Sequence, residues 1–399
     1  MDDDASLADF RKETRAWLES ACPPAMRVPT RSDDEDYWGG RRGRFPSEDA
    51  KVWFERMALR GWTVPTWPRE YGGGGLSEAE GRVVVQEMRA LGCRLPLKSY
   101  GIWMLGPVLM QFGSEAQRRE HLPRIARGEI RWCQGYSEPG AGSDLASLQT
   151  RAVRDGDHYV VNGQKVWTSH ADKADWMFCL VRTDPEAPKH RGISFVLIDM
   201  TSPGIRVRPI RLISGYSPFC ETFFEDVRVP VANLVGHENA GWEAAKALLS
   251  HERSLISTLR DAASSDEEPL ASLARRYLDS PEGPLPDRAL RDRITQANMD
   301  FLCNGLTLKR SQEGVAAGKG PGPESSMFKL YGTELNKRRR ELKVLLCGFA
   351  GIGWEGDGFS TEELTITRDW LRSRANSIEG GSSEIQLNII AKRVLGLPD

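Results

Sequence analysis

The apolar residues of this chain repeat with a helical period at both ends and with a strand period in the middle. Near the N-terminus, LADFRKETRAWLESA places Leu7, Phe10, Trp17 and Leu18 at helical spacing. GGLSEAEGRVVVQEMRALG then follows a glycine run, and Ser77 stands where the N-cap of a helix is expected. From AGWEAAKALLSHERSL onward the helical pattern returns, interrupted by the Pro- and Gly-rich pieces DSPEGPLPD and GKGPGPESS.

Between these helical blocks the chain is β-prone. TRAVRDGDHYVVNGQKVWTSH has two turn signals, Gly156-Asp157 and Asn162-Gly163, as in a hairpin or a meander. GISFVLIDM, GIRVRPIRLI and ETFFEDVRVP continue as expected strands. The order predicts an α+β fold that is mostly α, with a helical N-terminal domain at 1–130, a central β domain at 131–237 and a C-terminal helical bundle at 238–399.

The net charge and the cysteine content limit the kinds of function that this chain can have. The formal net charge is -2 over 399 residues, which argues against a nucleic-acid binder. No apolar run approaches the ~20 residues of a membrane span, and MDDDASLADF lacks the basic-then-apolar order of a secretory signal. The seven cysteines are scattered without a C-x-x-C pair. We therefore expect reduced cysteines, most of them in the core, in a cytoplasmic protein.

The first candidate for chemistry is WCQGYSEPGAGSDL, where the β-prone region begins. Gly140 and Gly142 let the backbone approach a ligand closely, and the hydroxyls of Ser137 and Ser143 can bond acceptor oxygens. The alternative is an ordinary glycine-rich turn. The context is neither the strand-to-helix G-x-G-x-x-G nor the P-loop, which excludes a Rossmann or nucleoside-triphosphate site.

The second candidate is NGQKVWTSH, in which an expected strand carries Trp167 beside two hydroxyls. An indole can stack on a planar cofactor, and a hydroxyl can bond a ring nitrogen. The alternative is a core Trp on one face of a sheet.

The third candidate is the loop NSIEGGSSEIQ, which offers Glu379 as a base or backbone N–H groups as a ligand site. These N–H groups would open a C-terminal helix and would suit a phosphate, a polyol or a polarised carbonyl oxygen. The alternative is an ordinary Ser-capped helix, with Glu384 complementing the helix dipole.

The fourth candidate is Glu252, which falls on one helical stripe with Leu248 and Leu255. A carboxylate on the apolar face of a helix has a raised pKa unless it is paired, which suits general-base work near neutral pH. The alternative is a buried ion pair, with Arg253 or with another helix. The six histidines do not cluster, and neither H-E-x-x-H nor G-x-S-x-G occurs, so we expect no metal site.

Taken together, these motifs resemble the acyl-CoA dehydrogenase flavoprotein family over nearly the whole chain. YSEPGAGSDLASLQTRA is similar to the flavin loop of that family, FEDVRVPVANLVG to its β-domain exit, and IEGGSSEIQLNIIAKRVLG to its C-terminal signature. The resemblance implies a C-terminal four-helix bundle, with FAD between the β domain and the helical domains. It also implies α,β-dehydrogenation of an acyl-CoA thioester to the trans-2-enoyl-CoA, in which a glutamate removes the α-proton and the β-hydrogen leaves as hydride to flavin N5.

The resemblance assigns roles residue by residue. The implied flavin contacts are Gln134, Tyr136, Ser137, Trp167, Ser169, Ser382 and Glu384. Trp167 would pack beside the ring and Ser169 would bond near N5. The implied substrate contacts are Ser143 and Arg253 along the thioester arm and the turn at Gly380.

Two glutamates compete for the role of base. Many family members place it in a Tyr-Glu-Gly-Thr turn, and the position matching that Glu here is Gly380, so Glu379 is one residue out of register. Another branch, which includes the isovaleryl and long-chain dehydrogenases, carries the base on a bundle helix directly before an Arg, as in SHERS. We therefore predict Glu252 as the catalytic base and keep Glu379 as the alternative.

The sequence departs from the pattern of the family at two places that bear on its subunit partners. The Arg-x-x-Phe-Gly element that usually reaches the FAD of a neighbouring subunit is missing from YLDSPEGPLPD, and Leu345 replaces a Gln that often meets the adenine end. Either the FAD site is built differently or the chain pairs with a different homologous chain. The expected assembly is a homo- or heterotetramer, a dimer of dimers, and the expected electron acceptor is an electron-transferring flavoprotein. The alternatives are a half-site or non-catalytic subunit and an acyl-CoA oxidase.

Overall fold

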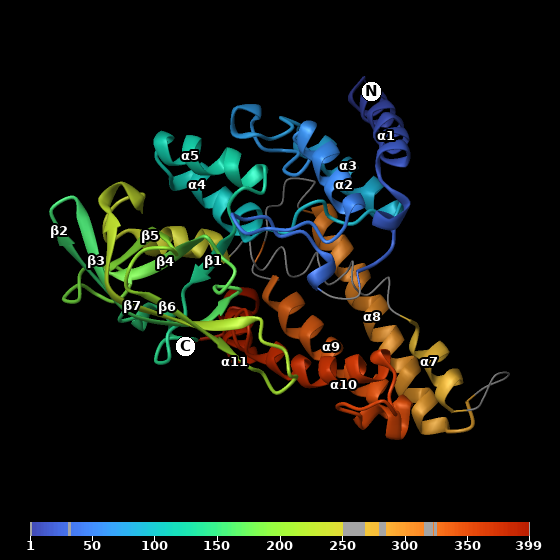
Figure 1. Cartoon of the computed structure of the whole chain (residues 1–399). Helices are drawn as coiled ribbons and strands as arrows, with labels where there is room; N and C mark the ends of the chain where they lie inside the picture. Colours follow the sequence, from blue (N-terminus) through green and yellow to red (C-terminus); the bar gives the residue numbers. More distant parts are fainter. Residues whose placement is uncertain are drawn as a thin grey trace. The chain divides into compact units, whose positions relative to one another are not determined.

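The structure is a computed structural model that describes residues 2–30, 33–249, 268–278, 285–314, 322 and 325–398. The chain divides into two compact units, one formed by 1–210 with 218–251 and the other by 211–217 with 252–399. The first unit holds the N-terminal helices and the β-sheet, and the second holds the C-terminal helices (Figure 1). The predicted fold class, helical then β then helical, is confirmed.

The N-terminal part of the first unit is helical, as predicted. The α-helices are α1 (Asp2–Ala21), α2 (Glu48–Leu59), α3 (Glu78–Ala90), α4 (Gly106–Phe112), which follows a π-helical turn at Gly101–Leu105, and α5 (Glu115–Ala126). Ser77 caps α3 in a capping box with Glu80, as predicted. Leu18, Trp53 and Val84, from three different helices, pack into one buried cluster, which fixes α1 to α3 against one another.

The β domain of the first unit is a mostly antiparallel sheet. Its strands are β1 (Trp132–Gly135), β2 (Arg151–Asp155), β3 (His158–Ser169), β4 (Trp176–Arg182), β5 (Ile193–Asp199), β6 (Ile205–Ile210), β7 (Phe219–Pro230) and β8 (Leu234–Val235). The strand order is β6-β7-β3-β2-β4-β5-β8, and β1 pairs in parallel with β4. β4 and β5 are buried along most of their length, because their two faces pack against two different hydrophobic clusters.

One of the two predicted turns is present and the other is wrong. The Gly156-Asp157 pair closes the β2–β3 hairpin, with Gly156 at φ +63°. At Asn162-Gly163 the strand continues, and the register between β3 and β7 shifts there instead. Asn162 exchanges hydrogen bonds with Asp226 of β7, at 3.0 and 2.9 Å, and these contacts hold the chain in the sheet. Asn-Gly thus marks a bulge here rather than a turn.

The second unit is built from helices around their own core. They are α7 (Leu270–Tyr277), α8 (Arg288–Gly314), α9 (Ser325–Cys347), α10 (Thr361–Ser373) and α11 (Ser383–Ile389), and α11 runs into a π-helical turn at Ile390–Val394. Leu273, Ile294, Leu346 and Ile366 of the first four helices meet in one buried cluster. α11 and the loop before it pack on α9. This loop contains Gly380 and Gly381 and is called the glycine loop below.

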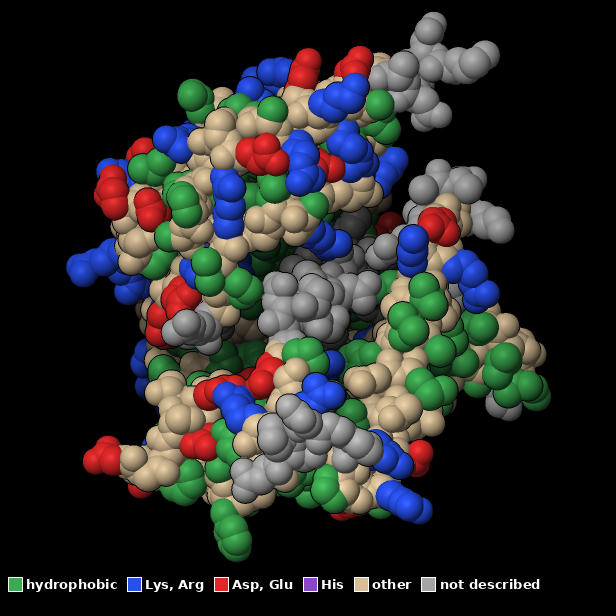
Figure 2. Space-filling view, turned by 90° about the vertical axis from the view of Figure 1, so that its right-hand side faces the viewer, with side chains coloured by type: hydrophobic (Ala, Val, Ile, Leu, Met, Phe, Trp, Pro, Cys, Tyr) green, Lys and Arg blue, Asp and Glu red, His purple; other side chains and the backbone are tan. Residues whose placement is uncertain are grey.

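Charges are mixed over the surface. Figure 2 shows Lys and Arg side chains interspersed with Asp and Glu on the face drawn, in keeping with a net charge of -2. In the described parts of the chain, no helix is both long enough and apolar enough to cross a membrane.

Candidate active site

The loop between β1 and β2 carries the predicted contacts Tyr136 and Ser137, and a buried lysine anchors it. Lys165 of β3 is fully buried, and its Nζ donates to the Tyr136 carbonyl at 3.1 Å and to Glu138 Oε1 at 2.7 Å. Val166 N–H donates to the Ser137 carbonyl at 2.9 Å. Three consecutive residues of the loop are therefore tied to one strand.

Glu138 completes this anchor. Its carboxylate also accepts the backbone N–H groups of Gln149 at 2.6 Å and of Thr150 at 2.8 Å. Burial by itself raises the pKa of Glu138, but the charge and hydrogen bond of Lys165, together with these donors, outweigh it and lower the pKa. Glu138 thus bonds both β3 and the segment that leads into β2, and these contacts fix the geometry of the loop.

The predicted flavin contacts on this loop differ in exposure. The Tyr136 ring is buried, edge-on to Phe178 at 6.1 Å and to Phe195 at 6.4 Å. Gln134, on β1, and Ser137 are each half-buried. Gln134 and Ser137 thus keep part of their surface available for a ligand, while the Tyr136 side chain packs in the core.

Trp167 combines an exposed side chain with a backbone conformation that is rare for a tryptophan. Its side chain is 53% exposed, and its backbone has φ +59°, a region that bulky residues rarely adopt. The register between β3 and β7 shifts between Lys165 and Thr168, so Trp167 sits on a bulge that turns its indole out of the sheet. Strain of this kind concentrates at functional sites.

The residues that follow Trp167 lie at the end of the same strand, β3. Thr168 is fully buried, and its hydroxyl finds no hydrogen-bond partner among the described residues. Ser169 is half-buried at the end of β3, and His170 follows it at φ +55°. An exposed, strained indole beside hydroxyl groups fits the edge of a flavin ring, so these residues are compatible with FAD.

Gly140 and Gly142, the glycines of the first candidate motif, are not among the predicted flavin contacts. Ser143 is exposed, and a Cβ added at Gly140 or Gly142 would meet open space. A hollow of about 460 Å³ near Gly140 is lined by Glu138, Pro139, Ser147, Gln149, Thr150, Gly163 and Gln164 as well. None of the predicted flavin contacts lines it, so we assign it no role in cofactor binding.

In the second unit, the glycine loop has a backbone that only glycine adopts easily. Gly380 has φ +62° and Gly381 φ +89°, and a Cβ at Gly381 would come within 2.6 Å of Gln386 Nε2. Ser382 follows and caps α11 by accepting a hydrogen bond from Ile385 N–H. Hydrogen bonds from its own backbone and from Ser382 lower the pKa of Glu384, which is exposed.

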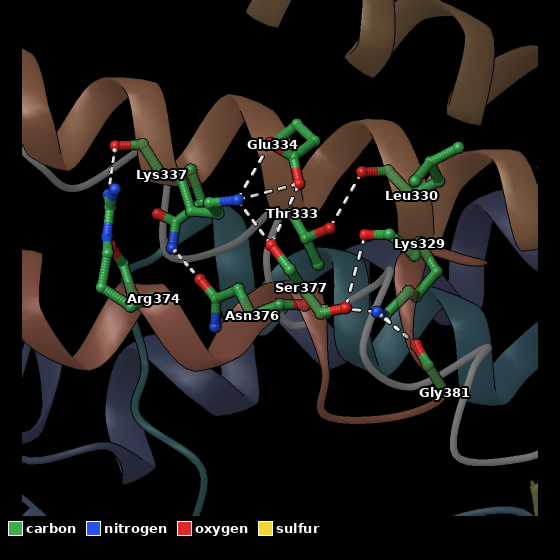
Figure 3. Close-up of polar contacts among 12 residues, drawn as sticks. Lys329, Leu330, Thr333, Glu334, Lys337, Arg374, Asn376, Ser377 and Gly381 are labelled. Carbon is green, nitrogen blue, oxygen red and sulfur yellow. Dashed lines mark hydrogen bonds and ion pairs between the residues drawn. The ribbon is translucent and has the colours of Figure 1, made fainter. Parts of the chain in front are cut away.

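Lys329 holds both ends of this loop. It lies on α9, is 5% exposed, and its Nζ donates to the Asn376 carbonyl at 3.2 Å and to the Gly381 carbonyl at 2.5 Å (Figure 3). Asn336 Nδ2 supports the loop by donating to Asn376 Oδ1 at 2.8 Å. The segment between the two carbonyls is the one that contains Glu379 and Gly380.

Glu379, the alternative base, is held by two side chains. Arg372 Nη2 on α10 lies 2.7 Å from Glu379 Oε2, and Asn376 Nδ2 donates to Glu379 Oε1. The predicted base Glu252 and its neighbour Arg253 lie outside the described residues. Leu248, on the predicted stripe, is fully buried in the helical stretch 241–249.

The residues that anchor the β1–β2 loop and the loop before α11 were missed in the sequence: Lys165 in the first unit, and Lys329 and Arg372 in the second. For Lys165 a signal existed, since Tyr159 and Val161 precede it at a period of two and are buried on the same face of β3. Lys329 and Arg372 gave no such signal, because their partners are 47 and 7 residues away along the chain.

Comparison with known proteins gives three matches to family models that follow one another along the chain. The N-terminal domain of acyl-CoA dehydrogenases matches residues 5–129, the middle domain 133–227 and the C-terminal domain 239–395.

Individual relatives extend over almost the whole chain. Acyl-CoA dehydrogenase IpdE1 of Mycobacterium tuberculosis is 37% identical over 404 residues, covering 98% of this chain and 98% of that protein. The solved structure titled Tcur3481-Tcur3483 steroid ACAD is 32% identical, with a TM-score of 0.78 over 99% of this chain and 98% of the other. The ChsE4-ChsE5 complex from Mycobacterium tuberculosis is 29% identical, with a TM-score of 0.73 over 99% and 98%.

Proposed function

Because this chain belongs to the acyl-CoA dehydrogenase family, whose members are oxidoreductases, we propose that it converts an acyl-CoA thioester to the trans-2-enoyl-CoA with FAD as cofactor. The observation that carries the proposal is the edge formed by Trp167 and Ser169, where a strained, exposed indole stands beside a hydroxyl. FAD, when bound there, supplies the acceptor for the β-hydride.

Glu252 is the proposed base that removes the α-proton. The support is indirect and comes from Glu379, whose two carboxylate oxygens are occupied by Arg372 and Asn376. A general base needs an oxygen within hydrogen-bond reach of the proton that it takes. Glu379 would have to give up one of these contacts, whereas the glycine at position 380 leaves space for a carboxylate that comes from elsewhere.

The remaining proposed residues bind and orient the cofactor and the substrate. Gln134, Ser137, Ser382 and Glu384 are the proposed cofactor contacts. The backbone N–H at the Gly380 turn polarises the thioester carbonyl, which lowers the cost of enolate charge at that oxygen. Ser143 and Arg253 are the proposed contacts of the CoA arm, and the proposed electron acceptor is an electron-transferring flavoprotein.

The proposed acyl group is bulky and ring-bearing, of the steroid-derived type. The support is the 32% identity over nearly the full chain with the Tcur3481-Tcur3483 steroid ACAD. A panel of purified straight-chain, branched and steroid-type acyl-CoA thioesters, each mixed anaerobically with the yellow protein, tests both proposals. We expect the flavin to bleach first with the steroid-type thioester. Bleaching by short straight-chain thioesters alone would contradict the substrate class, and no bleaching by any thioester would contradict the reaction.

A half-site subunit of a heteromeric enzyme is the second candidate function. It is favoured by the missing Arg-x-x-Phe-Gly element, by Leu345, and by relatives solved as complexes of two different chains. The absorption spectrum of the chain purified alone distinguishes the two. A yellow protein with one FAD per chain supports the complete enzyme, and a colourless one that gains FAD only with a homologous partner supports the half-site.

A further inference from the structure

Four aromatic side chains from three separate segments of the first unit meet in one place. The first ring lies between α1 and α2, the second and third lie at the π-helical turn before α4, and the fourth directly follows β3. This aromatic cluster consists of Trp38, Tyr100, Trp103 and His170. Each of these residues is half-buried, so part of its surface remains exposed.

The rings of the aromatic cluster stand in two main orientations. The centroid of the Trp38 ring lies 5.1 Å from that of His170 and 5.6 Å from that of Tyr100. Trp103 is close to perpendicular to Trp38 and to Tyr100, with interplanar angles of 77° and 81°. Tyr100 and His170 are within 27° of parallel. Flat apolar surfaces that meet at a steep angle suit a rigid ring system better than a round or flexible group.

Trp38 is held against the other rings from two sides. The segment before the π-helical turn bonds the residue that precedes Trp38, because Lys98 N–H donates to the Tyr37 carbonyl at 2.8 Å. The Arg131 guanidinium lies over the Trp38 ring, 4.8 Å from its centroid. The indole is therefore fixed both through its backbone and through a stacked cation.

A buried carboxylate ties the same loop to the sheet. Asp175 is 3% exposed, and its Oδ2 accepts the backbone N–H groups of Arg41 and Arg131, each at 2.9 Å. At the end of β3, His170 N–H donates to the Pro218 carbonyl at 2.9 Å. These bonds lie within the first unit and order the cluster without a ligand, so binding there costs little conformational freedom of the protein.

The aromatic cluster begins one residue after Ser169, the proposed contact near flavin N5. Since neighbouring Cα atoms are about 3.8 Å apart, His170 lies close to the place where the β-carbon of a substrate would give up its hydride. The acyl group beyond the β-carbon needs apolar protein surface to leave water. A rigid ring system gains contact with flat aromatic faces and has few bond rotations to lose, whereas a straight chain loses rotational freedom at each bond.

We propose that the aromatic cluster is the subsite for the ring system of the acyl group, and that Trp38 and Trp103 set the preference for ring-bearing over straight-chain acyl groups. This inference rests on the proposed function, because it takes Ser169 as the neighbour of the reacting carbon. The cluster contacts the acyl group beyond the β-carbon and takes no part in the transfer of proton or hydride. Its residues determine specificity and are not catalytic.

The test is calorimetric titration of the purified full-length protein with two 2-enoyl-CoA thioesters, which are already oxidised at the α- and β-carbons. One carries a steroid nucleus beyond the β-carbon, and the other is trans-2-hexenoyl-CoA. Trp38→Leu and Trp103→Leu should each raise the dissociation constant of the steroid thioester about 3- to 10-fold, and that of hexenoyl-CoA less than about twofold. Trp38→Phe keeps a ring and should retain most of the affinity of the wild type.

Trp17→Leu is the matched control and should change neither constant. Trp17 is also a half-buried indole of the first unit, and it also lies under a guanidinium, that of Arg60 at 4.4 Å from the ring centroid. Partial unfolding of a variant would weaken the binding of both thioesters alike, so the ratio of the two constants isolates the subsite.

Two outcomes overturn the inference. The first is a wild type that binds hexenoyl-CoA as tightly as the steroid thioester. The second is a ratio of the two constants that Trp38→Leu and Trp103→Leu leave unchanged. Flavin bleaching by the corresponding saturated thioesters tests the reaction separately, so selective binding of the steroid thioester without any bleaching would support the subsite and contradict the proposed reaction.

Discussion

Arg372 Nη2 lies 2.7 Å from Glu379 Oε2, and both side chains are less than a third exposed, at 27% and 30%. The pair joins α10 to the loop that precedes α11, and Asn376 binds the other carboxylate oxygen. A glutamate in a glycine-rich loop of this family suggests a catalyst, but here both of its carboxylate oxygens are bonded by neighbouring side chains.

The first prediction compares the two glutamates. Glu252→Gln should slow flavin reduction by acyl-CoA by about 10³-fold or more, because the proton acceptor is lost. Glu379→Gln should slow it by less than about tenfold and lower the free energy of unfolding by about 1 kcal/mol or less, the range of a partly exposed ion pair. Anaerobic stopped-flow absorbance measures the rates. Arg372→Gln is the matched control and should behave like Glu379→Gln; the reverse ranking of the two glutamates would make Glu379 the base.

The second prediction concerns Lys165. Lys165→Met leaves the buried Glu138 carboxylate without its cation, which should cost about 3–5 kcal/mol of stability and weaken FAD retention, since the Tyr136 carbonyl and Glu138 lose their anchor. Adding Glu138→Gln to Lys165→Met should recover part of the stability because no charge is left unpaired. Thermal melting and the ratio of flavin to protein absorbance give both readouts. Equal stability of the single and double variants would contradict the charge argument.

The third prediction concerns Trp167. Because its side chain is 53% exposed and its backbone is strained at φ +59°, Trp167→Gly should leave the melting temperature of the apoprotein unchanged or raise it. The same change should weaken FAD binding about 3- to 10-fold, in line with the loss of one aromatic contact. Titration of apoprotein with FAD, followed by flavin fluorescence, measures the affinity. Phe349→Ala removes an aromatic side chain that is 90% exposed in the other unit, and it should leave the affinity unchanged.

The fourth prediction is a pH dependence that originates at His121. The ring is 1% exposed between Trp132 at 5.3 Å and Trp176 at 5.2 Å, and its Nδ1 has no partner among the described residues. Burial lowers its pKa, so the folded protein keeps it neutral while the unfolded chain protonates it near the ordinary value of about 6.5. Stability is therefore full above that value and falls as the pH drops below it.

The measurement for His121 is urea unfolding between pH 7.5 and 5. The stability of the wild type should fall by up to about 1.4 kcal/mol per pH unit from this group, in addition to other titrations. His121→Gln should have a shallower slope over the same range, although its stability at pH 7.5 is lower. Parallel slopes for the two proteins would show that another group carries the dependence.

Local patterns predicted the order of elements and several of their ends. Ser77 caps a helix where the sequence places it, a serine caps the C-terminal helix as one of the two alternatives had it, and Gly156-Asp157 closes the expected hairpin. These features depend on residues a few positions apart, so a single sequence contains the necessary information.

The anchors of the two loops depend on contacts between residues that lie far apart in the sequence. Lys165 meets Glu138 across 27 residues, and Lys329 meets Asn376 across 47. A lysine in a strand or a helix is usually a surface residue. The period of two in β3 hints that Lys165 is buried, but no local pattern identifies its partner. Asn162-Gly163 failed as a turn for the same reason, because the contact with Asp226, 64 residues away, keeps Asn162 in the sheet.

The two hydrogen bonds of Lys329 limit which changes of sequence the loop between Asn376 and Gly381 can accept. Two hydrogen bonds from one ammonium group fix the separation of the two loop ends, so an insertion or a deletion that moved Glu379 toward the place of Gly380 would have to change the path of the residues between them. A substitution at position 380 meets the second obstacle, a backbone at φ +62° that disfavours any side chain. Position 380, which the resemblance matches to the base of many family members, therefore has a backbone that disfavours a glutamate, and the lysine that holds the ends of its loop lies on another helix, α9.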